Sequence, residues 1–297
     1  MSVLPLHGAI TALVTPFLPG GQLDEAAFRA LVAWQIADGI DGLVPVGSTG
    51  EAATLTLAER VRVVAITAEV ARGRVPVIAG AGASDTAVAI ENSVALAAAG
   101  ATHLLHVSPA YSKPPQRGIV AHFRAVADAS PLPVVLYNVP GRTASNMEAD
   151  TTLALAEHPN IVAVKEASGN LVQIAEIIRR RPAGFVVLSG DDPLTLGVMA
   201  QGGEGVISVV SNAAPAAMHA LTAAAAALDL ARARALHDQL APLFAAAFVE
   251  SNPIPIKAAL AAMGRIRNIL RLPLVPLDER HASSLRLALV AAGVLTP

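Results

Sequence analysis

The chain has 297 residues, enough for one large α/β domain with a sizeable core or for two small ones. Its formal net charge is −2 with no basic block or basic–aromatic stripe, so we expect no nucleic-acid partner, and its lack of cysteine excludes disulfides, thiolate metal sites and cysteine nucleophiles. No positive charge precedes Arg29 and no long apolar stretch is uninterrupted, so the sequence predicts a cytoplasmic protein without signal peptide or membrane span.

Short apolar runs alternate with stretches whose apolar residues recur at helical spacing. The apolar runs cover residues 9–14, 42–46, 75–79, 103–107, 134–137, 161–165, 185–189 and 205–209. The helical stretches include residues 24–37, 57–72, 85–99, 118–129 and 171–180, with Asp24 and Asp85 as expected N-caps and Gly39 and Gly100 as expected helix ends. Parallel strands covered on both faces read as continuous apolar runs, so this order predicts a (β/α)₈ TIM barrel; a doubly wound sheet is the alternative.

After Asn212 the sequence is alanine-rich and shows no further strand; the helical pattern is interrupted only around residues 252–255 and 272–273. We therefore expect two parts. Residues 1–212 would form the barrel that carries the active site, and residues 213–297 would form a helical region packed on the barrel.

Polar residues gather directly after the apolar runs, where a barrel places its active site. They include Gly47–Glu51 after the second run, Tyr111 after the fourth, Tyr137 and Arg142 at the end of the fifth, Lys165 at the end of the sixth, Gly190 and Asp191 after the seventh, and Ser208 in the eighth.

Lys165 is one of only three lysines and ends an apolar strand. Burial there would lower its pKa from about 10.4 towards about 7–8 and leave a free amine able to attack a ketone. The alternative is a lysine that reaches solvent or pairs with Glu166.

Tyr137 and the turn at Gly47–Glu51 are further candidates, each with a structural alternative. The turn offers backbone N–H groups and two hydroxyls that suit a small carboxylate, or it is only a flexible strand-to-helix connection. Tyr137 offers a phenol for proton transfer, or it is a half-buried aromatic residue. The histidines show no metal-binding spacing, because His103 and His106 would face opposite ways on a strand; we expect no metal and no cofactor.

Motifs at residues 46–51, 76–80, 137–143, 164–170, 188–192, 205–209 and 252–257 occur in an order that resembles the pyruvate-dependent class I aldolases. Within that N-acetylneuraminate lyase superfamily, the chain is most similar to the dihydrodipicolinate synthase family. The resemblance runs from about Gly8 to the C-terminus.

The resemblance implies that Lys165 forms a Schiff base with pyruvate, with Thr49 and the backbone of Ile207 holding the pyruvate and Tyr137 as general acid/base. Ser48 and a tyrosine from the neighbouring subunit, at Tyr111, would relay protons, so a tight dimer would complete each site. Many members of the family pair two such dimers into a tetramer. Arg142 would bind the carboxylate of aspartate semialdehyde, and Gly190 and Asp191 would also contact substrate.

Two other functions stay open. One is another pyruvate lyase, acting on N-acetylneuraminate, 2-keto-3-deoxygluconate or 4-hydroxy-2-oxoglutarate, although such lyases generally lack an arginine at position 142. The other is a barrel that binds a keto acid without catalysis.

Many relatives bind the regulator lysine through an acidic side chain, an amide and a tyrosine at the dimer interface. The matching positions in this chain are Val88, Ser84 and Ala110, with Leu57 and Arg60 nearby. Because a buried ammonium needs a carboxylate partner, we expect lysine to inhibit poorly.

Overall fold

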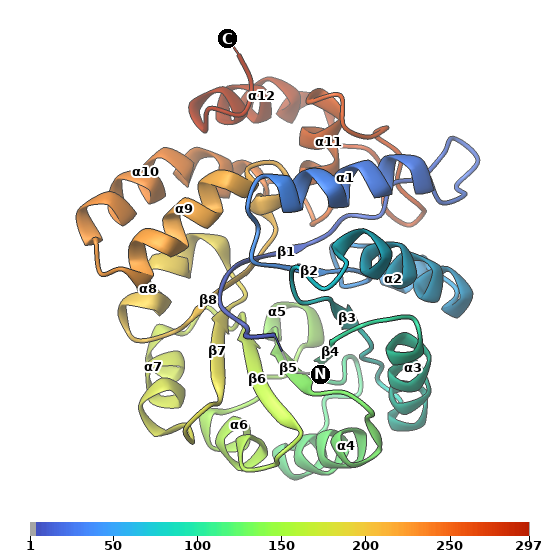
Figure 1. Ribbon diagram of the computed structural model, residues 1–297, viewed down its shortest axis with the longest axis vertical. Coiled ribbons are helices and arrows are strands. Elements are labelled where there is room, and N and C mark those ends of the chain that lie inside the picture. Colours follow the sequence, from blue (N-terminus) through green and yellow to red (C-terminus); the bar gives the residue numbers. More distant parts are fainter. Residues whose placement is uncertain (1–3, 297) are drawn as a thin grey trace.

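The structure, a computed structural model, describes residues 4–296 and contains a barrel of eight parallel strands (Figure 1). The order around the sheet is β2-β1-β8-β7-β6-β5-β4-β3, and a parallel bridge between Leu43 and Val77 joins its two ends. The predicted TIM barrel is thereby confirmed over the doubly wound sheet. The strands are β1 Gly8–Ala12, β2 Gly42–Val44, β3 Ile78–Gly80, β4 His103–Val107, β5 Val134–Asn138, β6 Ile161–Glu166, β7 Val186–Ser189 and β8 Gly205–Ser208.

Helices follow the strands and form the outer layer (Figure 1). They are α1 Glu25–Ala37, α2 Leu57–Ala71, α3 Thr86–Ala98, α4 Gln116–Ala129, α5 Pro140–Thr143, α6 Ala149–Ala156, α7 Leu171–Arg180 and α8 Thr195–Ala200, with short 3₁₀ turns at Ala52–Thr54, Asp192–Leu194, Val210–Asn212 and Glu279–His281. The predicted caps are confirmed: the side chains of Asp24 and Asp85 accept hydrogen bonds from backbone N–H groups of the first turn. Gly39 and Gly100 follow their helices with φ of +86° and +99°.

The third strand begins later than the sequence suggests, at Ile78 instead of residue 75. Pro76 has no N–H to donate to a ladder, and the N–H of Val77 is bonded to the side chain of Thr102. The regular register with β4 therefore begins at Ile78, although the carbonyl of Val77 accepts hydrogen bonds from the N–H groups of Thr102 and His103.

Alternate strand residues face the barrel interior, where Ile10, Val44, Val135, Ala163 and Ile207 belong to one buried apolar cluster. Tyr137 follows Val135 by two residues and Lys165 follows Ala163 by two, so both side chains point inward at the carboxyl end of the barrel. The remaining strand residues pack against the helices in two further apolar clusters.

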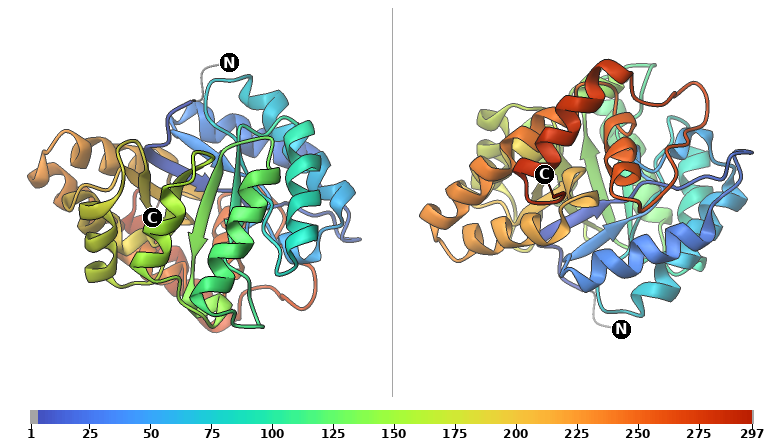
Figure 2. Two further views of the ribbon diagram at one scale, coloured as in Figure 1. Left: turned by 90° about the horizontal axis from the view of Figure 1, so that it is seen from below. Right: turned by 90° about the horizontal axis from the view of Figure 1, so that it is seen from above.

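The C-terminal helices are α9 Pro215–Ala226, α10 Leu230–Ala246, α11 Ile254–Ala262 and α12 Ala282–Ala291. They gather on the side of the barrel that carries α1 (Figures 1 and 2). Helix α9 packs against both β1 and α10, and α10 and α11 pack against α12. The division of the chain after residue 212 stays a prediction. Within residues 4–296, no helix combines the length and the apolar character needed to cross a membrane.

Candidate active site

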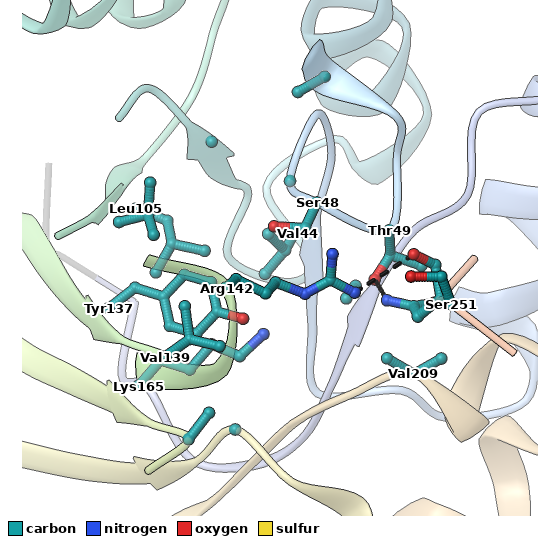
Figure 3. A pocket seen from close by; sticks show the side chains of 18 of the residues that line it. Val44, Ser48, Thr49, Leu105, Tyr137, Val139, Arg142, Lys165, Val209 and Ser251 are labelled. Carbon is teal, nitrogen blue, oxygen red and sulfur yellow. Dashed lines mark hydrogen bonds between the residues drawn. The ribbon is translucent and has the colours of Figure 1, made fainter. Parts of the chain in front are cut away.

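A cavity of about 990 Å³ opens at the carboxyl ends of the strands (Figure 3). Most of the predicted site residues line it, namely Ser48, Thr49, Tyr137, Arg142, Lys165, Gly190 and Asp191. Two predicted residues do not. Ile207 is fully buried in β8, and Tyr111 projects from its loop with 95% of its surface exposed.

Lys165 lies inside this cavity and is only 6% exposed. It pairs in register with Tyr137 across β5 and β6, and its Nζ lies 4.4 Å from the centre of the Tyr137 ring. Burial lowers the pKa of Lys165 to about 8, with Asp192 and Asp191 opposing that shift and Arg142 adding to it. At mildly alkaline pH, Lys165 is therefore a neutral amine in a large fraction of the protein molecules.

The alternative role for Lys165, as a residue that reaches solvent or pairs with Glu166, is wrong. Glu166 is the next residue on the strand and points to the opposite face. Its carboxylate accepts hydrogen bonds from the N–H of Ser168 at 2.7 Å and from the side chains of Asn138 and Gln173.

Gly190 leaves the room that the Lys165 side chain occupies. A Cβ atom at this position would lie 3.1 Å from Cγ and Cε of Lys165 and 2.6 Å from Cβ of Ala167. A larger residue would therefore collide with Ala167 and crowd the lysine side chain, which accounts for a glycine directly after β7.

Tyr137 is also buried, with 7% of its surface exposed. Burial raises the pKa of its phenol to about 12; Arg142 opposes the shift and Asp191 adds to it. The resting side chain is thus a protonated phenol, ready to donate a proton, and its phenolate would be a strong base.

The turn at Gly47–Glu51 is closed by hydrogen bonds from Gly50 N to Gly47 O and from Glu51 N to Ser48 O. Val46 and Glu51, at its two ends, have φ of +51° and +54°, a region that costs energy for residues with a Cβ. Thr49 is buried inside the turn and Ser48 is exposed on it. Hydrogen bonds within the turn therefore define its conformation, and its role in binding a carboxylate stays a prediction.

A buried ion pair between Glu51 and Lys257 supports this turn. Glu51 accepts a hydrogen bond at 2.6 Å from Nζ of Lys257, which also donates to the carbonyl of Thr15 at 2.9 Å. Both charged side chains are completely buried, and the backbone N–H of Arg271 donates to the second oxygen of Glu51 at 3.0 Å. The turn is therefore fixed by residues of the C-terminal region.

Arg142, on α5, extends across the cavity towards Thr49 (Figure 3). Its Nη2 donates to the backbone carbonyl of Asn252 at 3.2 Å, and the side chain of Asn252 donates to Oγ1 of Thr49 at 2.9 Å. The guanidinium has no carboxylate partner among the described residues, so it is available to an anionic ligand.

Comparison with known proteins shows which family the chain belongs to. The model of the dihydrodipicolinate synthetase family matches residues 5–292. The chain belongs to this family. The resemblance seen in the sequence is confirmed.

Relatives in the dihydrodipicolinate synthetase family are similar over nearly their full length. The 4-hydroxy-tetrahydrodipicolinate synthase of Koribacter versatilis is 51% identical over 98% of both chains, and that of Sorangium cellulosum is 53% identical over 94% of this chain and 93% of its own. A dihydrodipicolinate synthase of Acinetobacter baumannii solved with pyruvate is 43% identical with a TM-score of 0.96, covering 98% of this chain and 100% of its own. The enzyme of Cyanidioschyzon merolae, solved with lysine bound, is 44% identical with a TM-score of 0.94. The match covers 97% of this chain and 99% of the other.

The positions that the resemblance matches to lysine-binding groups, Ser84, Val88 and Ala110, carry no carboxylate. Ser84 exchanges two hydrogen bonds of 3.2 Å with the backbone of Ala110, and Val88 is exposed. Nη2 of Arg60 donates to the carbonyl of Ala52 at 2.7 Å, and burial lowers the pKa of Arg60. The predicted insensitivity to lysine stays a prediction.

The sequence patterns assigned no role to several residues that support the site of this family member. Asp192 is buried and accepts hydrogen bonds from Ser208 and from the N–H groups of Val209 and Val210, so it fixes the end of β8. Lys257 was recognisable only as one of three lysines, and Asn252 only as part of a motif. His103 and His106 are buried in β4, and residues 4–296 contain no cluster of three potential metal ligands.

Proposed function

We propose that this chain condenses pyruvate with L-aspartate 4-semialdehyde to form 4-hydroxy-tetrahydrodipicolinate, a step of lysine and diaminopimelate biosynthesis. The observation that carries the proposal is a buried Lys165 amine facing the Tyr137 phenol, in a cavity that also contains the guanidinium of Arg142. The names of relatives about 50% identical over nearly the whole chain support the same reaction.

In the first half of the reaction, the neutral amine of Lys165 attacks the keto carbon of pyruvate. Tyr137 donates a proton to the departing hydroxyl, water leaves, and a protonated imine forms. The Tyr137 phenolate then has the basicity to remove a proton from the methyl group, which gives an enamine. Thr49 and the backbone at Ile207 would hold the pyruvate, as the family resemblance implies, and Gly190 leaves room beside the lysine side chain.

In the second half, the enamine carbon attacks the aldehyde carbon of the semialdehyde, and the aldehyde oxygen takes the proton that the Tyr137 phenol gained from the methyl group, which leaves a protonated imine and a phenolate. The amine of the same substrate then attacks the imine carbon and expels Lys165, which closes the ring. Arg142 binds the carboxylate of this substrate, for which its planar fork of N–H donors is suited. Asp191 lies near Lys165 and would contact the bound substrate.

We further propose that two chains form a tight dimer, that two dimers form a tetramer, and that the protein works in the cytoplasm. Tyr111 supports the dimer, because this large side chain is 95% exposed, lies outside its own cavity and follows β4 at the active-site end. In a dimer the partner's Tyr111 would join Ser48 and Tyr137 in the proton relay. One relative of known structure, 40% identical with a TM-score of 0.96 over 98% of both chains, is a monomeric dihydrodipicolinate synthase variant, so sedimentation of this chain is the direct measurement.

The decisive experiment is a coupled assay with pyruvate and aspartate semialdehyde, run beside a cleavage assay with N-acetylneuraminate. We expect turnover only in the first. Borohydride reduction in the presence of pyruvate should add one reduced pyruvate to Lys165. An adduct on Lys113 or Lys257 would refute the mechanism, and cleavage of the sugar acid would favour another lyase of the superfamily.

A further inference from the structure

Arg142 lies on a loop, residues 139–147, that connects the end of β5 to α6; we call it the Arg142 loop. Its helix α5 has only four residues, which is too short to be stable alone, so the place of Arg142 depends on how the loop ends are held. The side chain of Asn138 joins these ends. Its oxygen accepts the N–H of Met147 at 2.9 Å, and its nitrogen donates to the carbonyl of Met147 at 3.2 Å and to Oδ1 of Asn146 at 2.8 Å.

Gln173 on α7 holds the same end of the Arg142 loop from outside. Its Nε2 donates to the carbonyl of Met147 at 3.1 Å, and its Oε1 accepts from Nδ2 of Asn146 at 2.8 Å. Nε2 also donates to Oε2 of Glu166 at 3.1 Å, and this oxygen accepts from Asn138 at 3.1 Å as well. Each amide meets donors at its oxygen and acceptors at its nitrogen, so the orientation of both amides is fixed.

Glu166 connects this network to the Schiff-base lysine. It follows Lys165 directly in β6, is 1% exposed, and accepts the N–H of Ser168 at 2.7 Å through its other oxygen. One buried carboxylate therefore holds both the strand that carries the amine and the loop that carries the guanidinium. In the proposed reaction the amine holds pyruvate and the guanidinium holds the aldehyde, so the separation of these two groups decides whether the reacting carbons meet.

We propose that Asn138, Glu166 and Gln173 form a clamp that sets the place of Arg142 relative to Lys165. Gln173 is then a positioning residue for the carboxylate of the aldehyde substrate. None of the three clamp side chains lines the cavity, so each would act on the substrate through the Arg142 loop. This inference rests on the proposed function, in which Arg142 binds that carboxylate.

The first test replaces Gln173 by methionine, which keeps the length of the side chain and removes its hydrogen bonds. We expect the KM for aspartate semialdehyde to rise about 3- to 10-fold, the scale of one net hydrogen bond. The KM for pyruvate and the rate of borohydride trapping at Lys165 should change less than about twofold, because the lysine is still held by its own strand.

Asn160→Ala is the matched control. Its Nδ2 donates to the carbonyls of Ala127 at 2.9 Å and Ser130 at 3.1 Å, and it precedes β6 at the end of the barrel opposite to the cavity. The substitution removes a comparable set of hydrogen bonds. It should therefore lower stability in urea by a similar amount and leave the KM for both substrates unchanged.

The double variant Arg142→Ala/Gln173→Met separates positioning from a general loss of structure. If Gln173 acts through Arg142, its replacement should add nothing to the KM for aspartate semialdehyde once the guanidinium is gone. Two results would overturn the inference: losses that add in full in the double variant, or an unchanged KM for aspartate semialdehyde in Gln173→Met.

If Gln173→Met fails to fold, Asn146→Ala breaks the same clamp from the side of the loop. The same comparison with Arg142→Ala then applies, and full additivity or an unchanged KM for aspartate semialdehyde would again count against the clamp. Failure of the proposed function is distinct, because the wild-type protein would then not turn over aspartate semialdehyde at all.

Discussion

Replacing Lys257 by methionine should strongly destabilise the protein and loosen the turn that carries Thr49. The side chains of Lys257 and Glu51 are both completely buried, 2.6 Å apart, and burial already lowers the pKa of the lysine. Methionine fills much of the same volume and packs against Phe17, whose ring centre lies 4.4 Å from Nζ in the native protein. The substitution therefore removes the charge with little loss of packing.

The expected loss comes from the carboxylate that remains. Without Lys257, Glu51 keeps one hydrogen bond from the backbone of Arg271 and no buried cation at contact distance. Removing one partner of a buried pair typically costs about 3–5 kcal/mol of unfolding free energy. At about 2–4 °C per kcal/mol, the midpoint of thermal unfolding should fall by roughly 6–20 °C. The KM for pyruvate should rise as well, because the turn positions Thr49.

Urea unfolding and steady-state kinetics measure both effects in three variants, namely Lys257→Met, Glu51→Gln and the double variant. We expect the double variant Lys257→Met/Glu51→Gln to be more stable than Lys257→Met alone, because the neutral amide costs far less to bury than an unpaired carboxylate. A single variant within about 1 kcal/mol of the wild type, or a double variant that loses the plain sum of both single losses, would refute this reasoning.

Four further predictions concern the active site. The rate of Schiff-base formation should rise about tenfold per pH unit below a pKa of about 8 and level off above it, because only the neutral form of Lys165 attacks pyruvate. Borohydride trapping measures this rate, and a rate that does not change between pH 7 and 9 would contradict the prediction. Tyr137→Phe should keep the fold, seen by circular dichroism, but lower kcat by about 10²–10⁴, and near-normal turnover would remove Tyr137 from acid/base catalysis. Lysine should not inhibit initial rates with a half-inhibition concentration below about 1 mM, an affinity of roughly 4 kcal/mol. Exhaustive chelation should leave activity intact; a loss that added metal restores would indicate a different class of aldolase.

The barrel and the pairing of Lys165 with Tyr137, the proposed catalytic residues, could be predicted because both depend on local patterns. Strands buried on both faces are apolar throughout, so a lone lysine or tyrosine at the end of one is conspicuous. Tyr137 and Lys165 meet because β5 and β6 are neighbours in sequence and in the sheet.

The supporting contacts could not be predicted, because they join segments far apart in the chain. Asn252 and Thr49 are 203 residues apart, and Lys257 and Glu51 are 206 apart. The room that Gly190 leaves for Lys165 depends on the packing of β6 beside β7 and has no signature in the sequence. The position of Tyr111 outside its own cavity likewise requires the folded chain.

The dependence of the Gly47–Glu51 turn on residues 252–271 sets the order in which a newly made chain becomes competent. Once residue 208 has left the ribosome, all eight strands exist, and so does every site residue that the sequence predicted. Glu51 still lacks its cation, however, and Thr49 lacks its amide partner, until Asn252, Lys257 and Arg271 have been translated and docked. We therefore expect C-terminally clipped chains to lose pyruvate binding, because Thr49 and Glu51 lose the partners that position the turn.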